Sequence, residues 1–358
     1  METVRTLPVP PLMLGEGPVW HARRETLYFV DIDGCMIYGW QDGPGLVTRL
    51  PMPDRTGFVV PWGGGLLAVA GDALYCVDPD SAEITPVLRL ALDAGVRFND
   101  GKCDPEGRLW AGVMAVDRSR TDTAALGALY GIVPEGPFQR LAPMDIPNGM
   151  AWDASGAFYH TDTATGRILR YRRGADGRIH DPETAVTVED GAPDGMCIDG
   201  QGMLWVALWG AGRVQRYDPQ TGRALAECVS VPQRNASCCC LGGRDGRTLY
   251  ITTAQSDGQA GGGCMPAAWR YPARCRMRGG DNIKEETACR NRPIPCCAGR
   301  KARSSARCIN PWAMTTKRSP VRWWRWSTPS PPPRPAISPW TSSPARCSWA
   351  SNRPEARR

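Results

Sequence analysis

Short strand-like runs of apolar residues recur along positions 1–255 of the chain. Each run starts with Leu or Phe and continues with aromatic, small or β-branched residues. The run occurs six times, at Leu27–Asp31, Leu66–Ala70, Leu109–Val113, Phe158–Asp162, Leu204–Leu208 and Leu249–Thr253. The steps between their first residues are 39, 43, 49, 46 and 45. One four-stranded propeller blade occupies a period of this length, so the pattern predicts an all-β fold, a six-bladed β-propeller.

Turn residues support this interpretation. Asp-x-x-Gly sequences at Asp104–Gly107, Asp153–Gly156 and Asp199–Gly202 each precede one of the apolar runs. These residue types favour tight turns between strands. On pattern alone a β-sandwich stays open as an alternative, but the even spacing disfavours it.

The repeat stops after about residue 255. The segment 256–358 is rich in Arg, Pro, Ser, Cys and Trp, and no acidic residue lies between Glu286 and Glu355. We therefore predict a propeller domain over 1–255 with a last blade that is incomplete. We interpret 256–358 as a disordered segment or as the product of a reading-frame change near residues 256–264. The alternative is a genuine Arg/Trp-rich module that contacts nucleic acid or membranes.

Charge divides the chain in the same place. Residues 1–255 hold 23 Lys and Arg against 31 Asp and Glu, whereas 256–358 holds 20 against 5. A negatively charged first region argues against a nucleic-acid surface there. The N-terminus lacks a charged start followed by an apolar stretch, no run reaches the roughly 18 apolar residues of a membrane span, and the fifteen cysteines follow no regular spacing. We expect a cytoplasmic, reduced protein.

Four stretches place an acid or an amide beside glycine, roughly ten residues or slightly less before an apolar run. They contain Glu16, Asn99, Asn148 and Asp194. Similar placement on successive blades would direct these side chains to one point on the propeller axis. Two carboxylates and an amide are oxygen donors that suit a divalent cation. Taken singly, the Asn-Gly and Asp-Gly pairs are simple turns, Glu16 is a solvated charge and Arg97 forms a surface ion pair, and these alternatives stay open.

The motifs GEGPVW, RFNDGK, PNGMAW and PDGMCIDGQGMLW occur in this order between residues 15 and 205. In order and spacing they resemble the senescence-marker-protein, regucalcin and gluconolactonase family, and the resemblance covers about residues 12 to 255. It implies a six-bladed propeller with one divalent metal in its central channel. It also implies hydrolysis of aldono-lactones to aldonic acids.

Carried over residue by residue, the resemblance places metal ligands at Glu16, Asn148 and Asp194, and substrate contacts at Arg97 and Asn99. Asp194 is then the expected general base. The metal could be Ca, Zn, Mg or Mn, and the expected partner is a small sugar lactone rather than nucleic acid or a membrane. The alternative function is a noncatalytic, calcium-binding regulatory propeller, as proposed for animal relatives. Oligomeric state is left open.

Two other features suggest chemistry but have simpler explanations. The chain has three histidines, and none lies in a His-Glu-x-x-His motif, so we expect His160 to be structural. The cysteines 238–240 are small thiols in an apolar run, which is ordinary packing for a buried strand.

Overall fold

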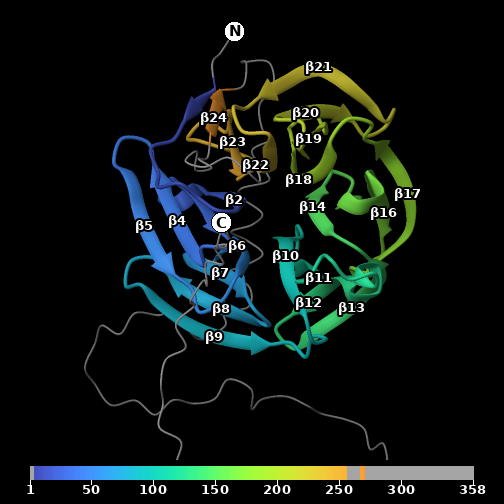
Figure 1. Ribbon diagram of the computed structural model, residues 1–358, viewed down its shortest axis with the longest axis horizontal. Helices are drawn as coiled ribbons and strands as arrows, with labels where there is room; N and C mark the ends of the chain where they lie inside the picture. Colours follow the sequence, from blue (N-terminus) through green and yellow to red (C-terminus); the bar gives the residue numbers. More distant parts are fainter. Residues whose placement is uncertain (1–3, 256–266, 271–358) are drawn as a thin grey trace, which may run out of the picture. The chain divides into compact units, whose positions relative to one another are not determined.

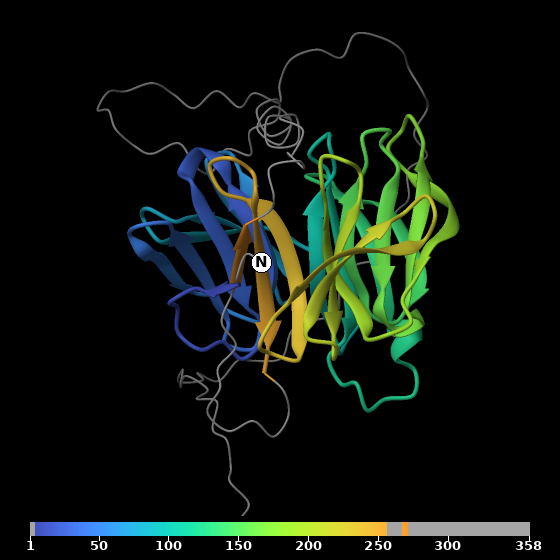
Figure 2. The same ribbon diagram turned by 90° about the horizontal axis from the view of Figure 1, so that it is seen from above.

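The computed structural model describes residues 4–255 and 267–270. These residues form antiparallel four-stranded sheets around a central axis, so the predicted all-β propeller is confirmed (Figure 1). The inner strands of the sheets run roughly along this axis (Figure 2). In the described part of the chain, no helix is both long and apolar enough to cross a membrane.

Five of the sheets are each built from four consecutive strands, as the sequence repeat predicts. The first two contain β2 (Gly15–His21), β3 (Thr26–Asp31), β4 (Met36–Gln41) and β5 (Gly45–Pro51), then β6 (Thr56–Trp62), β7 (Gly65–Ala70), β8 (Ala73–Asp78) and β9 (Glu83–Arg89). The third contains β10 (Val96–Cys103), β11 (Leu109–Ala115), β12 (Gly127–Val133) and β13 (Gly136–Met144). The fourth and fifth contain β14 (Pro147–Trp152), β15 (Phe158–Asp162), β16 (Arg167–Arg173) and β17 (Ile179–Thr187), then β18 (Ala192–Ile198), β19 (Leu204–Trp209), β20 (Arg213–Asp218) and β21 (Arg223–Ser230). Short helical turns η1 (Ala22–Arg24), α1 (Thr123–Leu126) and η2 (Thr163–Thr165) lie in the connections.

The remaining sheet departs from this scheme. Its strand order is β1-β24-β23-β22, which joins the start of the chain to its last described strands. These strands are β1 (Arg5–Thr6), β22 (Asn235–Gly242), β23 (Thr248–Ala254) and β24 (Ala267–Arg270). The sequence predicted an incomplete last blade without closing strands, and this was wrong: β24 pairs with β23, and β1 pairs with β24. The pairing covers the edge of β23 and links the two ends of the propeller.

The segment predicted to lie outside the propeller therefore contributes one short strand to it. Apart from Ala267–Arg270, that segment lies outside the described residues, so its predicted disorder or reading-frame origin stays a prediction. The domain boundary at residue 255 likewise stays a prediction.

Six inner strands surround the axis. Each of β2, β6, β10, β14, β18 and β22 is in contact with the next, and β22 returns to β2. Between neighbouring sheets the apolar faces pack into separate core clusters, which bury large side chains such as Trp110, Trp205 and Tyr250. The predicted packing role of the cysteines 238–240 is confirmed, because all three are buried in β22.

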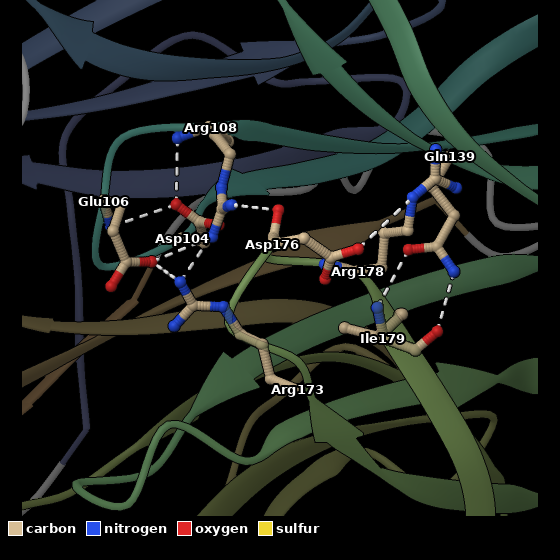
Figure 3. A network of polar contacts seen from close by, with 8 residues as sticks. All are labelled: Asp104, Glu106, Arg108, Gln139, Arg173, Asp176, Arg178 and Ile179. Carbon is tan, nitrogen blue, oxygen red and sulfur yellow. Dashed lines mark hydrogen bonds and ion pairs between the residues drawn. The ribbon is translucent and has the colours of Figure 1, made fainter.

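Polar contacts also join neighbouring sheets. At the junction of the third and fourth sheets, Arg173 forms an ion pair with Glu106, and the Arg108 guanidinium donates to the Asp176 carbonyl at 3.1 Å (Figure 3). Gln139 accepts from the Ile179 N–H at 2.8 Å and donates to its carbonyl at 2.7 Å (Figure 3). These contacts fix the two sheets against each other, as a rigid site between inner strands requires.

Candidate functional site

The predicted site residues all lie on inner strands. Glu16 lies on β2, Arg97 and Asn99 on β10, Asn148 on β14 and Asp194 on β18. Glu16, Asn148 and Asp194 are 7%, 5% and 5% exposed, so the solvated-charge alternative for Glu16 is wrong.

Each of these inner strands carries a β-bulge at the site residue. The pairing register shifts between Glu16 and Val19, between Phe98 and Gly101, between Pro147 and Met150, and between Pro193 and Met196. A bulge redirects side chains locally, and bulges are common beside active sites. The shared bulge explains why residues from separate sheets occupy equivalent positions near the axis.

The glycines beside Asn148 and Asp194 do not form hairpin turns, because both pairs lie within strands. A Cβ atom on Gly149 would lie 2.5 Å from the Asp194 carbonyl oxygen. On Gly195, it would lie 2.1 Å from the Cys238 Sγ atom. The inner strands thus approach too closely for any side chain at these positions. The turn interpretation of these two pairs is wrong, and the glycines instead permit close packing around the axis.

Burial strongly perturbs the acids. Burial, and then the negative charge of Asp100, raises the pKa of Glu16 to about 8. Burial, followed by the charges of Glu16 and Asp100, raises the pKa of Asp194 well above its ordinary value. Ionising carboxyl groups that are buried close together costs free energy, because the charges are desolvated and repel each other. A nearby cation would reduce this free-energy cost.

Hydrogen bonding leaves particular oxygen atoms free. Glu16 Oε2 accepts from the Gly17 N–H at 2.9 Å, whereas the buried Oδ1 atom of Asp194 has no hydrogen-bond partner. The Nδ2 atom of Asn148 donates to Thr163 Oγ1 at 3.1 Å, which leaves the amide oxygen of Asn148 for a ligand. Two carboxyls and one amide oxygen are donors that hard divalent cations prefer.

Arg97 and Asn99, the side chains expected to contact substrate, are held in place by hydrogen bonds, one of which joins them. Arg97 Nη1 donates to Asn99 Oδ1 at 2.9 Å and to the Phe98 carbonyl at 2.9 Å. Asn99 Nδ2 donates to the Pro147 carbonyl at 3.1 Å. Burial lowers the pKa of Arg97, but a guanidinium stays charged at any physiological pH. The remaining N–H groups of both side chains are available to a bound molecule.

Sequence reasoning missed two charged groups in the same stretch, Asp100 and Lys102. Burial raises the pKa of Asp100, and its Oδ1 accepts from the Gly101 N–H at 2.7 Å. Lys102 reaches from β10 to β18, where its Nζ donates to the Met196 carbonyl at 3.2 Å. Residues 1–255 contain 22 arginines but only one lysine, Lys102. This count could have drawn attention to Lys102 from the sequence alone.

Among the described residues, no group of three or more His, Cys, Asp or Glu is placed to hold a metal. The predicted ligand set has two carboxyls and an amide, so it does not need such a group. His160 is buried and stacks on Phe158, with a centroid separation of 5.9 Å, in keeping with the expected structural role.

Comparison with known proteins covers the same region of the chain. Residues 14–255 match the SMP-30/Gluconolactonase/LRE-like region. Regucalcin from Danio rerio is 35% identical over 247 residues, which cover 67% of this chain and 83% of that protein. A Bacillus subtilis protein named putative sugar lactone lactonase YvrE is 34% identical over 250 residues, which cover 68% of this chain and 84% of that protein. The crystal structure of a calcium-binding protein, regucalcin, from Agrobacterium tumefaciens is 25% identical with a TM-score of 0.68, covering 76% of this chain and 96% of that one.

Proposed function

Because the chain belongs to the SMP-30/gluconolactonase/LRE-like family, we propose that it hydrolyses sugar lactones to the corresponding acids with the help of a divalent cation. The observation that carries this proposal is the pair of buried carboxyls, Glu16 and Asp194, with an unpaired oxygen on Asp194. A pair of buried carboxyls lowers the stability of the folded protein, and such pairs are typical of functional sites. The sugar lactone lactonase assignment of the Bacillus relative supports the choice of substrate class.

Glu16, Asn148 and Asp194 would hold the cation. Their free oxygens fit a hard or borderline divalent ion, and the proposal leaves open Ca, Zn, Mg and Mn. When bound, the cation would supply Lewis acidity, which polarises a carbonyl and lowers the pKa of water.

Asp194, Arg97 and Asn99 have different roles in the proposed reaction. Asp194 is the general base: one oxygen of its carboxylate would hold the cation, and the other accepts a proton from the attacking water. Arg97 and Asn99 hold the sugar hydroxyls through their free N–H groups, which orients the lactone for attack. The mutual hydrogen bonds of Arg97 and Asn99 keep both donors preorganised. The water oxygen bonds to the carbonyl carbon of the lactone, the bond from that carbon to the ring oxygen breaks, and the ring oxygen leaves as a hydroxyl by taking the proton that Asp194 accepted.

The test is turnover of an aldono-lactone, followed as acid release, after chelation and after addition of each candidate cation. We expect chelation to abolish turnover and at least one cation to restore it. The alternative function, a noncatalytic calcium-binding propeller, predicts calcium binding by calorimetry without acid release above the uncatalysed rate. That result would replace the enzymatic proposal.

A further inference from the structure

A hydroxyl in the fourth sheet connects two of the proposed ligand strands. Thr163 starts the short helix η2, directly after β15. Its Oγ1 atom accepts from Asn148 Nδ2 at 3.1 Å and donates to the Pro193 carbonyl at 2.7 Å. One side chain therefore contacts both Asn148 on β14 and the residue that precedes Asp194 on β18.

The position of this hydroxyl is itself fixed. The backbone N–H of Thr163 donates to the Ile146 carbonyl at 3.2 Å, just before β14 begins. Helix η2 is followed by Gly166, whose φ of 67° is in the left-handed region that glycine adopts without strain. The backbone anchor and the bond to the Pro193 carbonyl restrict the rotation of the side chain.

The direction of the two hydrogen bonds determines how the Asn148 amide is oriented. The hydroxyl has one proton, which it gives to the Pro193 carbonyl, so it can only accept from the Asn148 side chain. The Asn148 amide must then present its NH2 group to Thr163 and its oxygen away from it. A flipped amide would place its oxygen against the hydroxyl oxygen and would turn a nitrogen with two protons toward the cation site.

We propose that Thr163 is a positioning residue that orients the Asn148 amide as a cation ligand and ties β18 to it. This inference rests on the proposed function, because it assigns Asn148 to the cation site. Hydrogen-bond partners of ligand side chains typically change metal affinity or activity by 10- to 100-fold when they are removed.

The experiment measures Mn²⁺ affinity by calorimetry in four full-length proteins. Thr163→Val keeps the shape of the side chain but loses the hydroxyl, and Thr163→Ser keeps the hydroxyl. The matched control is Thr165→Val, in the same helix, where the hydroxyl donates to the Asp162 carbonyl at 2.9 Å and makes no contact with the site.

We expect Thr163→Val to weaken Mn²⁺ binding about 10- to 100-fold, Thr163→Ser to stay within about threefold of wild type, and Thr165→Val to bind as wild type does. Mn²⁺ binding by Thr163→Val within about twofold of wild type would overturn the inference. Thr163→Ala replaces Thr163→Val if the valine variant does not fold.

A second readout separates this inference from the proposed function. In the metal-free protein, NMR exchange of the Asn148 side-chain amide protons with water should be slow in wild type and faster in Thr163→Val. If wild type bound none of Ca²⁺, Zn²⁺, Mg²⁺ and Mn²⁺, the proposed function would fail, while the NMR result would still decide whether Thr163 holds the Asn148 amide. Equal exchange in wild type and Thr163→Val would overturn the role of Thr163.

Discussion

Two aspartates five residues apart, Asp194 and Asp199, are both buried near the two ends of β18, and their surroundings are opposite. The Asp199 carboxylate accepts from the N–H groups of Gln201 and Met203 and from Trp205 Nε1. It also forms an ion pair with Arg216 at 2.7 Å. Asp194 has an unpaired oxygen, and its charged neighbours include two further acids.

The difference separates structural carboxylates from functional ones. A buried carboxylate that serves the fold is surrounded by donors, because an unpaired buried charge costs several kcal/mol. Asp104 repeats the pattern of Asp199 at the corresponding turn of the third sheet, accepting from the N–H groups of Glu106 and Arg108. We interpret a buried carboxylate without such donors, as at Asp194, as one that binds a ligand.

The largest effect on stability should come from the satisfied aspartate. Asp199→Ala removes a buried ion pair with Arg216, which keeps Glu227, and removes the acceptor of two backbone N–H groups and of Trp205 Nε1, so the free energy of unfolding should fall by about 3–5 kcal/mol. Urea unfolding at pH 7 measures this, with Asp218→Ala as the control at an exposed turn. A loss below about 1 kcal/mol would contradict the structural role assigned to Asp199.

Removing the buried acid Glu16 should change stability in the opposite direction. Glu16 keeps its proton in the folded protein up to a pKa of about 8, above its value in the unfolded chain, so its contribution to stability is lost as pH rises from about 4.5 to 8. In chelator at pH 9, Glu16→Gln should therefore be more stable than wild type by about 1–3 kcal/mol, and at pH 4 the two should be nearly equal.

Unfolding in urea at both pH values checks this prediction. Glu183→Gln, at an exposed acid paired with Arg170, is the control and should show no such gain. A Glu16→Gln variant less stable than wild type at pH 9 would show that the carboxylate serves the fold.

The smallest effect concerns His160. Burial without a hydrogen-bond partner lowers its pKa to about 3, below its ordinary value of 6.5. The unfolded chain then takes up a proton first, so stability falls as pH drops from 6.5 toward 3, by at most about 1.4 kcal/mol per pH unit. His160→Phe should lose less stability than wild type between pH 7 and pH 5, and His180→Phe, at an exposed histidine, should behave as wild type. Parallel pH profiles for wild type and His160→Phe would contradict the prediction.

The repeat could be predicted from the sequence because each apolar run forms the strand next to the inner strand of its sheet. These strands are buried on both faces. The sheet β1-β24-β23-β22 could not be predicted, because β1 has two residues and β24 lies beyond the change in composition. No local pattern marks either strand, since both are defined by pairing between distant parts of the chain.

The same distinction holds at the site. Glu16, Asn148 and Asp194 could be predicted because each sits at an equivalent place in its repeat, and the structure brings all three to inner strands. Thr163 could not be predicted, because its role depends on two hydrogen bonds that cross from one strand connection to β14 and β18. Spacing along the chain carries no information about such contacts.

The most direct test of the account compares Asp194→Asn with wild type in lactone hydrolysis at saturating Mn²⁺, with Mn²⁺ affinity measured on the same samples. If Asp194 is the general base, kcat should fall by about 10²- to 10⁴-fold while Mn²⁺ binding is weakened but still measurable. A kcat within about threefold of wild type would contradict the assignment of Asp194 and, with it, the proposal that the buried carboxyls of Glu16 and Asp194 form the catalytic site.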